Sequence, residues 1–108
     1  MPHNSSKLVL DIALACSEIQ TFTQGITFQD YQKDRMLQLA IEREFEIIGE
    51  AMSRLARLEP ETIEQRYPEY RRIIGLRNIL AHGYDVVDDR ILWDLAINKV
   101  PELKAQSA

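Results

Sequence analysis

The 108-residue sequence has little of what several protein classes require. Its single cysteine, Cys16, cannot form an internal disulfide, and no Cys/His spacing typical of a zinc site is present. No apolar run approaches the roughly 20 residues that a membrane-spanning helix needs. The opening "MPHNSSK" has no apolar core behind a basic start, so we expect no signal peptide, no membrane partner and a cytoplasmic location.

Glycine, proline and aromatic residues are also scarce, with four glycines, four prolines and 7% aromatics. Together with the lack of alternating apolar and polar residues, this argues against a β-sandwich or barrel. An apolar fraction of 45% is enough for one modest core, so we expect a single domain over residues 1–108. Residues 1–6 and 104–108 are expected to be frayed.

Apolar residues recur at helical spacing through most of the chain. The predicted helices cover about 7–23, 28–58, 69–82 and 89–98, with a short helical turn opened by Pro60. The second helix would be roughly 45 Å long at 1.5 Å per residue, which favours a bend or a partner subunit. We therefore predict an all-α, up-and-down bundle of four main helices plus a short extra helix.

Helix ends are marked by residues of the expected types. Thr27 and Asp30 have the spacing of a capping box, and Asp88 is a predicted N-cap. Gly83 suits the position after a helix C-terminus, and Val100-Pro101 is expected to end the last helix. Gly49, within the long helix, would allow another helix to pack closely.

The charge balance is acidic overall but basic in one window. The net charge of −4 argues against indiscriminate nucleic-acid binding. The window 66–77, "RYPEYRRIIGLR", holds four arginines and one glutamate, so it carries +3 and the rest of the chain −7. Such a patch could select a particular anion, or its arginines could pair with Glu64, Glu69 and other glutamates.

The stretch "RNILAHGY" places four polar or half-polar residues around the apolar residues 79–81. They are Arg77, Asn78, His82 and Tyr84. Asn78 and His82 are four residues apart and share a helix face. Arg77 and His82 differ by about 140° on a helix of 3.6 residues per turn, so they could approach a cleft from two sides. Tyr84 follows the glycine break and could reach the same space.

These groups suffice to cleave RNA without a metal. Histidine suits general acid–base catalysis at neutral pH, and an arginine fork matches phosphate. A base would take the ribose 2′-OH proton, the oxygen would attack phosphorus, and a fixed cation would stabilise the transition state. The alternative is structural, because histidine before glycine is also good helix-capping chemistry. Asp85, Asp88 and Asp89 are expected to form turns and caps rather than a metal site, and we expect no cofactor.

A longer segment makes the motif specific. "GLRNILAHGYDVVDDRILWDLAINKVPEL" resembles the C-terminal signature of the HepT-like subgroup of HEPN proteins, whose motif is R-x4-H-x-Y, commonly with Asn after the Arg. Arg77, Asn78, His82 and Tyr84 occupy all four positions. "ITFQDYQKDRMLQLAIEREFEIIGEA" is similar to the long second helix of that family, so the resemblance extends from about Lys7 to Leu103.

The resemblance implies a helical homodimer in which two Arg-x4-His motifs face a shared ribonuclease site. It further implies the toxin of a toxin–antitoxin module, with RNA as substrate and an MNT-type nucleotidyltransferase antitoxin as partner. In this family the antitoxin can transfer AMP to the motif tyrosine, which by position is Tyr84. Arg77 would stabilise the scissile phosphate, His82 would be the general acid/base, and Asn78 would orient groups or bind the RNA backbone. The long second helix would supply the dimer surface.

Other interpretations stay open. The protein could be a non-catalytic helical module that binds a nucleotide or a nucleotidyltransferase, or a dimeric scaffold in which the motif only caps a helix. Arg71 and Arg72 could contact RNA phosphates or form surface ion pairs. Cys16 and Trp93 are expected in the core, because each lies in an apolar helical stripe.

Overall fold

The computed structural model describes residues 2–82 and 88–108, and all regular structure in these ranges is helical. The elements are α1 (Pro2–Thr23), α2 (Phe28–Lys33), α3 (Arg35–Leu58), α4 (Pro60–Arg66), α5 (Tyr70–His82), α6 (Asp89–Asp94), the π-helical turn η1 (Leu95–Lys99) and α7 (Val100–Gln106). The segments α6, η1 and α7 follow one another directly and form one helix. Counted so, the described part has four main helices and two short ones, and the all-α prediction is confirmed.

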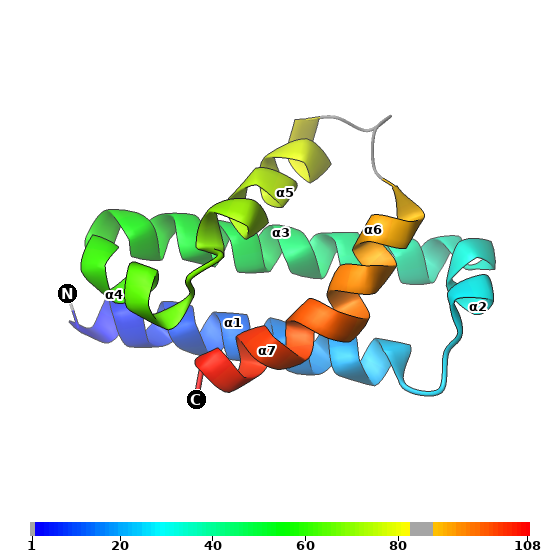
Figure 1. The fold of residues 1–108 in the computed structure, drawn as a ribbon, viewed down its shortest axis with the longest axis horizontal. Coiled ribbons are helices and arrows are strands. Elements are labelled where there is room, and N and C mark those ends of the chain that lie inside the picture. Colours follow the sequence, from blue (N-terminus) through cyan, green and yellow to red (C-terminus); the bar gives the residue numbers. More distant parts are fainter. Residues whose placement is uncertain (1, 83–87) are drawn as a thin grey trace.

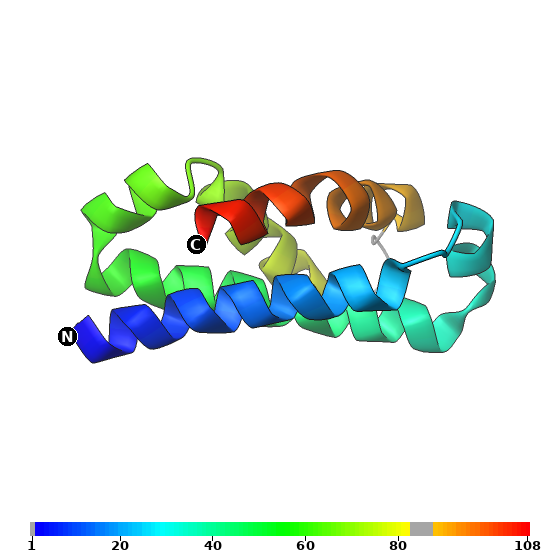
Figure 2. The ribbon, with the colours of Figure 1, turned by 90° about the horizontal axis from the view of Figure 1, so that it is seen from below.

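The molecule measures 42 × 28 × 19 Å along its three principal axes. The long helices α1 and α3 lie antiparallel along the longest of these axes (Figures 1 and 2). α5 packs on α3, while α7 packs on α1. The four main helices therefore surround one core, and α4 closes one end of it. In the part of the chain that the structure describes, no helix is long and apolar enough to cross a membrane.

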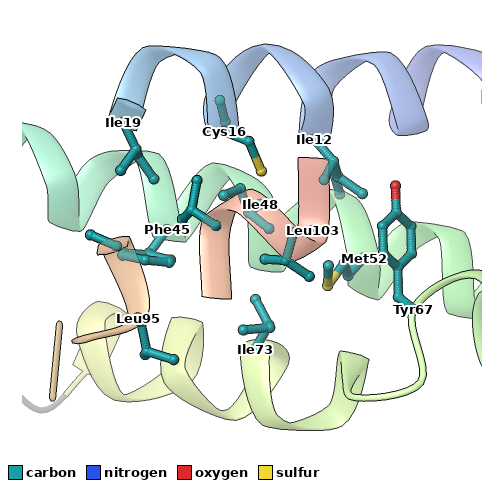
Figure 3. Packing of buried hydrophobic residues seen from close by; sticks show 14 of the residues in the cluster. Ile12, Cys16, Ile19, Phe45, Ile48, Met52, Tyr67, Ile73, Leu95 and Leu103 are labelled. Atoms are coloured by element: carbon teal, nitrogen blue, oxygen red, sulfur yellow. The ribbon is translucent and has the colours of Figure 1, made fainter. Parts of the chain in front are cut away.

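The core is built from the apolar stripes that the sequence predicts. Its fully buried side chains include Ile12, Cys16, Ile19, Phe45, Ile48, Met52 and Ile73, which meet between α1, α3 and α5 (Figure 3). Burial raises the pKa of the Cys16 thiol to about 12, so this group is a packed apolar residue. Trp93 is also buried, with its ring 5.3 Å from that of Tyr31 and 6.3 Å from that of Phe28, measured between centroids. Both core predictions are confirmed.

The prediction of one continuous helix over 28–58 is wrong. The capping box is present, with Asp30 N donating to Thr27 Oγ1 at 3.1 Å and Thr27 N donating to Asp30 Oδ2 at 3.0 Å. The helix then ends at Asp34, which leaves helical geometry with φ −115° and ψ 95°. The Asp34 carboxylate accepts from Leu37 N and so starts α3. An aspartate competes with helical backbone bonds and favours a cap, which explains the break without glycine or proline.

The last helix runs further than predicted. Asp88 is its N-cap, as expected, because its carboxylate accepts from Arg90 N at 2.8 Å. Val100-Pro101 does not end it. The backbone widens into η1, where Val100 N donates to Leu95 O, and then enters α7 with Pro101 in a first-turn position. Inside a continuous helix a proline removes one backbone hydrogen bond and crowds the carbonyl group one turn earlier, and the widened turn of η1 lies at this place.

Residues 104–108, for which the sequence predicts fraying, make several contacts with α4 and Tyr67 in the structure. α7 continues to Gln106, and Arg66 Nη1 donates to the carbonyl oxygens of Gln106 and Ala108 at 2.9 and 3.2 Å. The hydroxyls of Tyr67 and Ser107 are hydrogen-bonded at 2.6 Å. We call these contacts the 66–108 clasp. At the other end α1 already begins at Pro2, where fraying of residues 1–6 was expected.

Candidate functional site

Arg77, Asn78 and His82 lie on α5, which crosses α3 (Figure 1). Pro68 and Glu69 form a turn rather than the first helical residues, and α5 begins at Tyr70. The helix ends at His82. Gly83 and Tyr84, and with them the predicted helix-ending glycine and the motif tyrosine, lie outside the described residues, as does Asp85.

Gly49 on α3 is the point where α5 comes closest. A Cβ atom added at Gly49 would lie 2.3 Å from Arg77 Cβ, 2.9 Å from Arg77 Cγ and 3.2 Å from the Ile73 carbonyl oxygen. Only glycine leaves room for this crossing, so the prediction that Gly49 allows close packing is confirmed. The packing partner is the motif arginine itself, and the stem of Arg77 is thereby fixed against α3.

The guanidinium group of Arg77 is held by Glu50, the residue that follows Gly49 on α3. Arg77 Nη2 lies 2.8 Å from Glu50 Oε1, and the two side chains are 34% and 36% exposed. Glu50 Oε2 also accepts from Arg54 Nε at 2.9 Å, so the carboxylate is held from both sides. The hydrogen bond from Arg54 and the charge of Arg77 lower the pKa of Glu50. The guanidinium is therefore oriented but still open to solvent on part of its surface.

Asn78 and His82 complete the described part of the motif. Arg77 Nη1 donates to Asn78 Oδ1 at 3.1 Å, so the arginine and the asparagine are joined directly. His82, the last residue of α5, is exposed. No hydrogen bond or ion pair joins Arg77 to His82 within residues 2–82 and 88–108. Arg77 faces α3 and His82 is solvent-exposed, as five residues of helical rotation require.

Arg71 and Arg72 form the surface ion pairs that the sequence left open. Arg71 Nη2 lies 2.9 Å from Glu64 Oε1, and its guanidinium lies over the Tyr70 ring. Arg72 Nη1 lies 3.6 Å from Glu69 Oε1. Both arginine side chains are more than half exposed. Pairs so exposed contribute about 0–1 kcal/mol, so a phosphate could replace either carboxylate at little cost.

The acidic residues of the described part form no metal site. No group of three or more His, Cys, Asp or Glu side chains there has the arrangement to hold a metal ion. Asp88 is occupied as a helix cap, as predicted.

Glu50 and Arg54 are site residues that the sequence alone does not reveal. Both lie 20 or more residues before the motif, and neither belongs to a pattern that marks a site by itself. The available signal was the Gly49-Glu50 pair inside a long helix, because a glycine there already suggested a close helix crossing.

Fold and site together define a class, a small all-α bundle with an arginine and a histidine five residues apart in the last turns of one helix. A protein-family model described as ribonuclease HepT-like matches residues 12–108. The chain therefore belongs to the HepT-like ribonuclease family, and the resemblance inferred from the motif is confirmed.

Individual relatives agree with this assignment. A protein of Thermococcus cleftensis named probable ribonuclease HepT is 37% identical over 98 residues, which cover 89% of this chain and 86% of that protein. A provisionally named RNase of Methanocaldococcus jannaschii is 36% identical over 104 residues, or 94% of this chain and 83% of the relative. Another, from Caldanaerobacter subterraneus subsp. tengcongensis, is 34% identical over 84% of this chain and 80% of its own length. No solved structure shows a significant match.

Proposed function

We propose that this protein is a metal-independent endoribonuclease that acts as the toxin of a toxin–antitoxin module. The observation that supports this best is the oriented guanidinium of Arg77, which lies on the helix that ends in His82. A cation that is already in position costs no reorganisation when negative charge develops on a phosphate. Membership of the HepT-like ribonuclease family, and the ribonuclease names of its relatives, support RNA as the substrate.

In the proposed reaction each motif residue has one task. His82 takes the proton from a ribose 2′-OH, and the oxygen attacks the adjacent phosphorus. Arg77 stabilises the added charge on the phosphoryl oxygens with the N–H groups that Glu50 and Asn78 leave unused. A protonated imidazole then gives a proton to the departing 5′-oxygen, which leaves a 2′,3′-cyclic phosphate.

We further propose that two copies of the chain form a composite site. Arg77 and His82 leave α5 in directions about 140° apart, so one copy has difficulty in placing both on one phosphate. A second copy could supply the missing group. The exposed apolar side chains of Met36, Leu39 and Leu58 support α3 as part of the dimer surface.

The partner that would neutralise the toxin is an MNT-type nucleotidyltransferase antitoxin, which would transfer AMP to Tyr84. An added phosphate beside Arg77 and His82 would occupy the guanidinium and repel the RNA backbone. Adenylylation of this residue would therefore block the reaction without unfolding the bundle.

Cleavage of RNA in the presence of EDTA tests the enzymatic proposal. Unmodified protein, checked by intact mass for the absence of AMP, is compared with Arg77→Ala and His82→Ala variants. Arg43→Ala is the matched control, because Arg43 is an exposed α3 arginine that forms no ion pair with another residue of the described chain and does not act on Glu50. We expect cyclic-phosphate products from the wild type and the control, and a loss of at least about a hundredfold in both motif variants.

Mixing the two inactive variants tests the composite site. If each site takes Arg77 from one copy and His82 from the other, an Arg77→Ala/His82→Ala heterodimer has one complete site and should regain part of the activity. Lack of recovery in a confirmed heterodimer would show that each copy uses its own pair.

One observation favours a second candidate, a non-catalytic module that binds a nucleotide or a nucleotidyltransferase. The ion pair with Glu50 neutralises part of the Arg77 charge. If unmodified dimer cleaves none of several RNAs but binds ATP or AMP, this second function replaces the first.

A further inference from the structure

The outward face of α5 holds a glycine that the fold does not require. Gly75 lies in the middle of the helix, and a Cβ added there would meet no atom of the described residues within 4 Å. It has no positive φ, since Gly25 is the one described glycine in that region. A glycine inside a helix costs about 0.5–1 kcal/mol relative to alanine. At Gly49 the close packing of α5 offsets this cost. At Gly75 no contact within the described chain offsets it.

The neighbours of Gly75 on the helix surface are chemically distinctive. Positions three and four residues away on a helix are its nearest surface neighbours, and here they are Arg71, Arg72, Asn78 and Ile79, all exposed. His82 follows seven residues after Gly75 and lies on the same face. The bare backbone thus forms a shallow gap, framed by two guanidiniums, a carboxamide and one apolar side chain, that leads to the proposed general base.

The charge of this face indicates which kind of ligand would bind to it. α5 contains three arginines and a histidine and no aspartate or glutamate. The carboxylates that pair with Arg71 and Arg72 come from Glu64 and Glu69, outside the helix, through exposed contacts that a phosphate can replace. A second copy of the same face would bring like charges together. The helical stripe also carries no aromatic ring on which a base could stack.

Resting on the ribonuclease function proposed above, we propose that Gly75 is a contact point for the sugar-phosphate backbone of single-stranded RNA. The strand lies along the outward face of α5, with one phosphate at Arg71 and Arg72, a ribose against Gly75, and the scissile phosphate at His82. From Arg71 to His82 this path is about 16 Å long at 1.5 Å per residue. Any larger side chain at position 75 would lift the strand off the helix.

Substitution of Gly75 separates this role from a structural one, because stability and RNA affinity should change in opposite directions. Gly75→Ala should raise the midpoint of thermal unfolding by about 3 °C, as expected for an exposed helical glycine. Gly75→Gln should be at least as stable as the wild type and should bind RNA about tenfold more weakly, the loss expected for one broken phosphate contact. Ala105→Gln, which adds the same side chain on the exposed face of α7, is the matched control.

Affinity is measured by fluorescence anisotropy of a labelled single-stranded RNA, with His82→Ala in every protein to prevent cleavage. Light scattering gives the mass of each variant. Unchanged affinity of Gly75→Gln would overturn the proposal even if the wild type cleaves RNA. A changed mass with unchanged affinity per dimer would assign the face to a second copy. If the wild type binds RNA through this face but never cleaves it, the Gly75 contact is supported and the ribonuclease proposal is overturned. If the protein has no affinity for RNA, both proposals are overturned.

Discussion

Glu44 and Glu50 lie six residues apart on α3 and have opposite surroundings. Glu44 is only 7% exposed, and its Oε1 atom has no hydrogen-bond partner among the described residues. Burial, followed by hydrogen bonding with Glu18 and the charge of that residue, raises the pKa of Glu44 to about 7. Glu50 is held by Arg54 and Arg77, which lower its pKa. The same residue type on one helix is therefore a buried carboxyl group towards α1, neutral only below about pH 7, and a charged positioning group towards α5.

The two carboxyl groups consequently affect stability in opposite ways as the pH changes. A group whose pKa is raised on folding stabilises the protein at low pH, and that stabilisation is lost as the pH rises through the folded pKa. A group whose pKa is lowered stabilises at high pH and loses this effect as the pH falls. The difference teaches that the neighbouring helix, and not the position along α3, decides what each glutamate does.

The largest expected effect is on stability at Glu44. The pKa is 4.5 for the free group and about 7 in the folded protein. The wild type should therefore lose up to about 3 kcal/mol of unfolding free energy from Glu44 as the pH rises from 4.5 to above 7. Glu44→Gln should remove this loss and be more stable than the wild type at pH 8. Urea unfolding at pH 5 and pH 8 checks this, and equal pH dependence in both proteins would contradict it.

The next effect is on activity at Glu50. Glu50→Ala should free the Arg77 head and lower kcat by about a hundredfold, the cost of misplacing a catalytic group by about 1 Å. Glu50→Gln, which can still accept a hydrogen bond, should recover part of that loss. KM should change little or fall, because a negative charge near the RNA is removed. Glu42→Gln, on the same helix and paired with Arg35, is the control and should keep full kcat. A variant at Glu50 with wild-type kcat would show that the ion pair has no role in positioning.

A smaller effect on stability is expected at Gly49. Gly49→Ala would place a methyl group 2.3 Å from Arg77 Cβ, so α5 must move away from α3. We expect a cost of about 1–3 kcal/mol, as for other overpacked sites, together with reduced activity. Thermal unfolding and RNA cleavage are measured side by side with Gly75→Ala, where the same change should stabilise. Equal effects at the two glycines would contradict the structural difference between them.

Much of the fold could be predicted because its causes are local. The apolar stripes, the Thr27 capping box, the Asp88 cap and Pro60 at the start of α4 all depend on residues a few positions apart. The break at Asp34 was missed because an aspartate inside a helical pattern is usually tolerated. α2 can end at Asp34 because the side chain of Gln38 satisfies carbonyl groups of its last turn. Gln38 Nε2 donates to the carbonyl oxygens of Tyr31 and Gln32.

The site could be predicted only in part, for a related reason. Arg77, Asn78 and His82 belong to one short motif and were found from their spacing. Glu50 meets Arg77 across 27 residues of sequence, through a helix crossing that no local pattern encodes. The widened turn at η1 was missed in the same way, because Pro101 is a stop signal unless the preceding backbone is already displaced.

The 66–108 clasp has a consequence for how the chain opens. Because Arg66 and Tyr67 hold residues 106–108, the segment between them is a closed loop of roughly 40 residues that carries the whole motif. Closing a flexible loop of that length costs about 3 kcal/mol in chain entropy. Release of the clasp would return this entropy to the motif-bearing segment while the α1–α3 pair stays packed. Hydrogen exchange should therefore find α5 and α7 opening together, as one unit that is less protected than the two long helices.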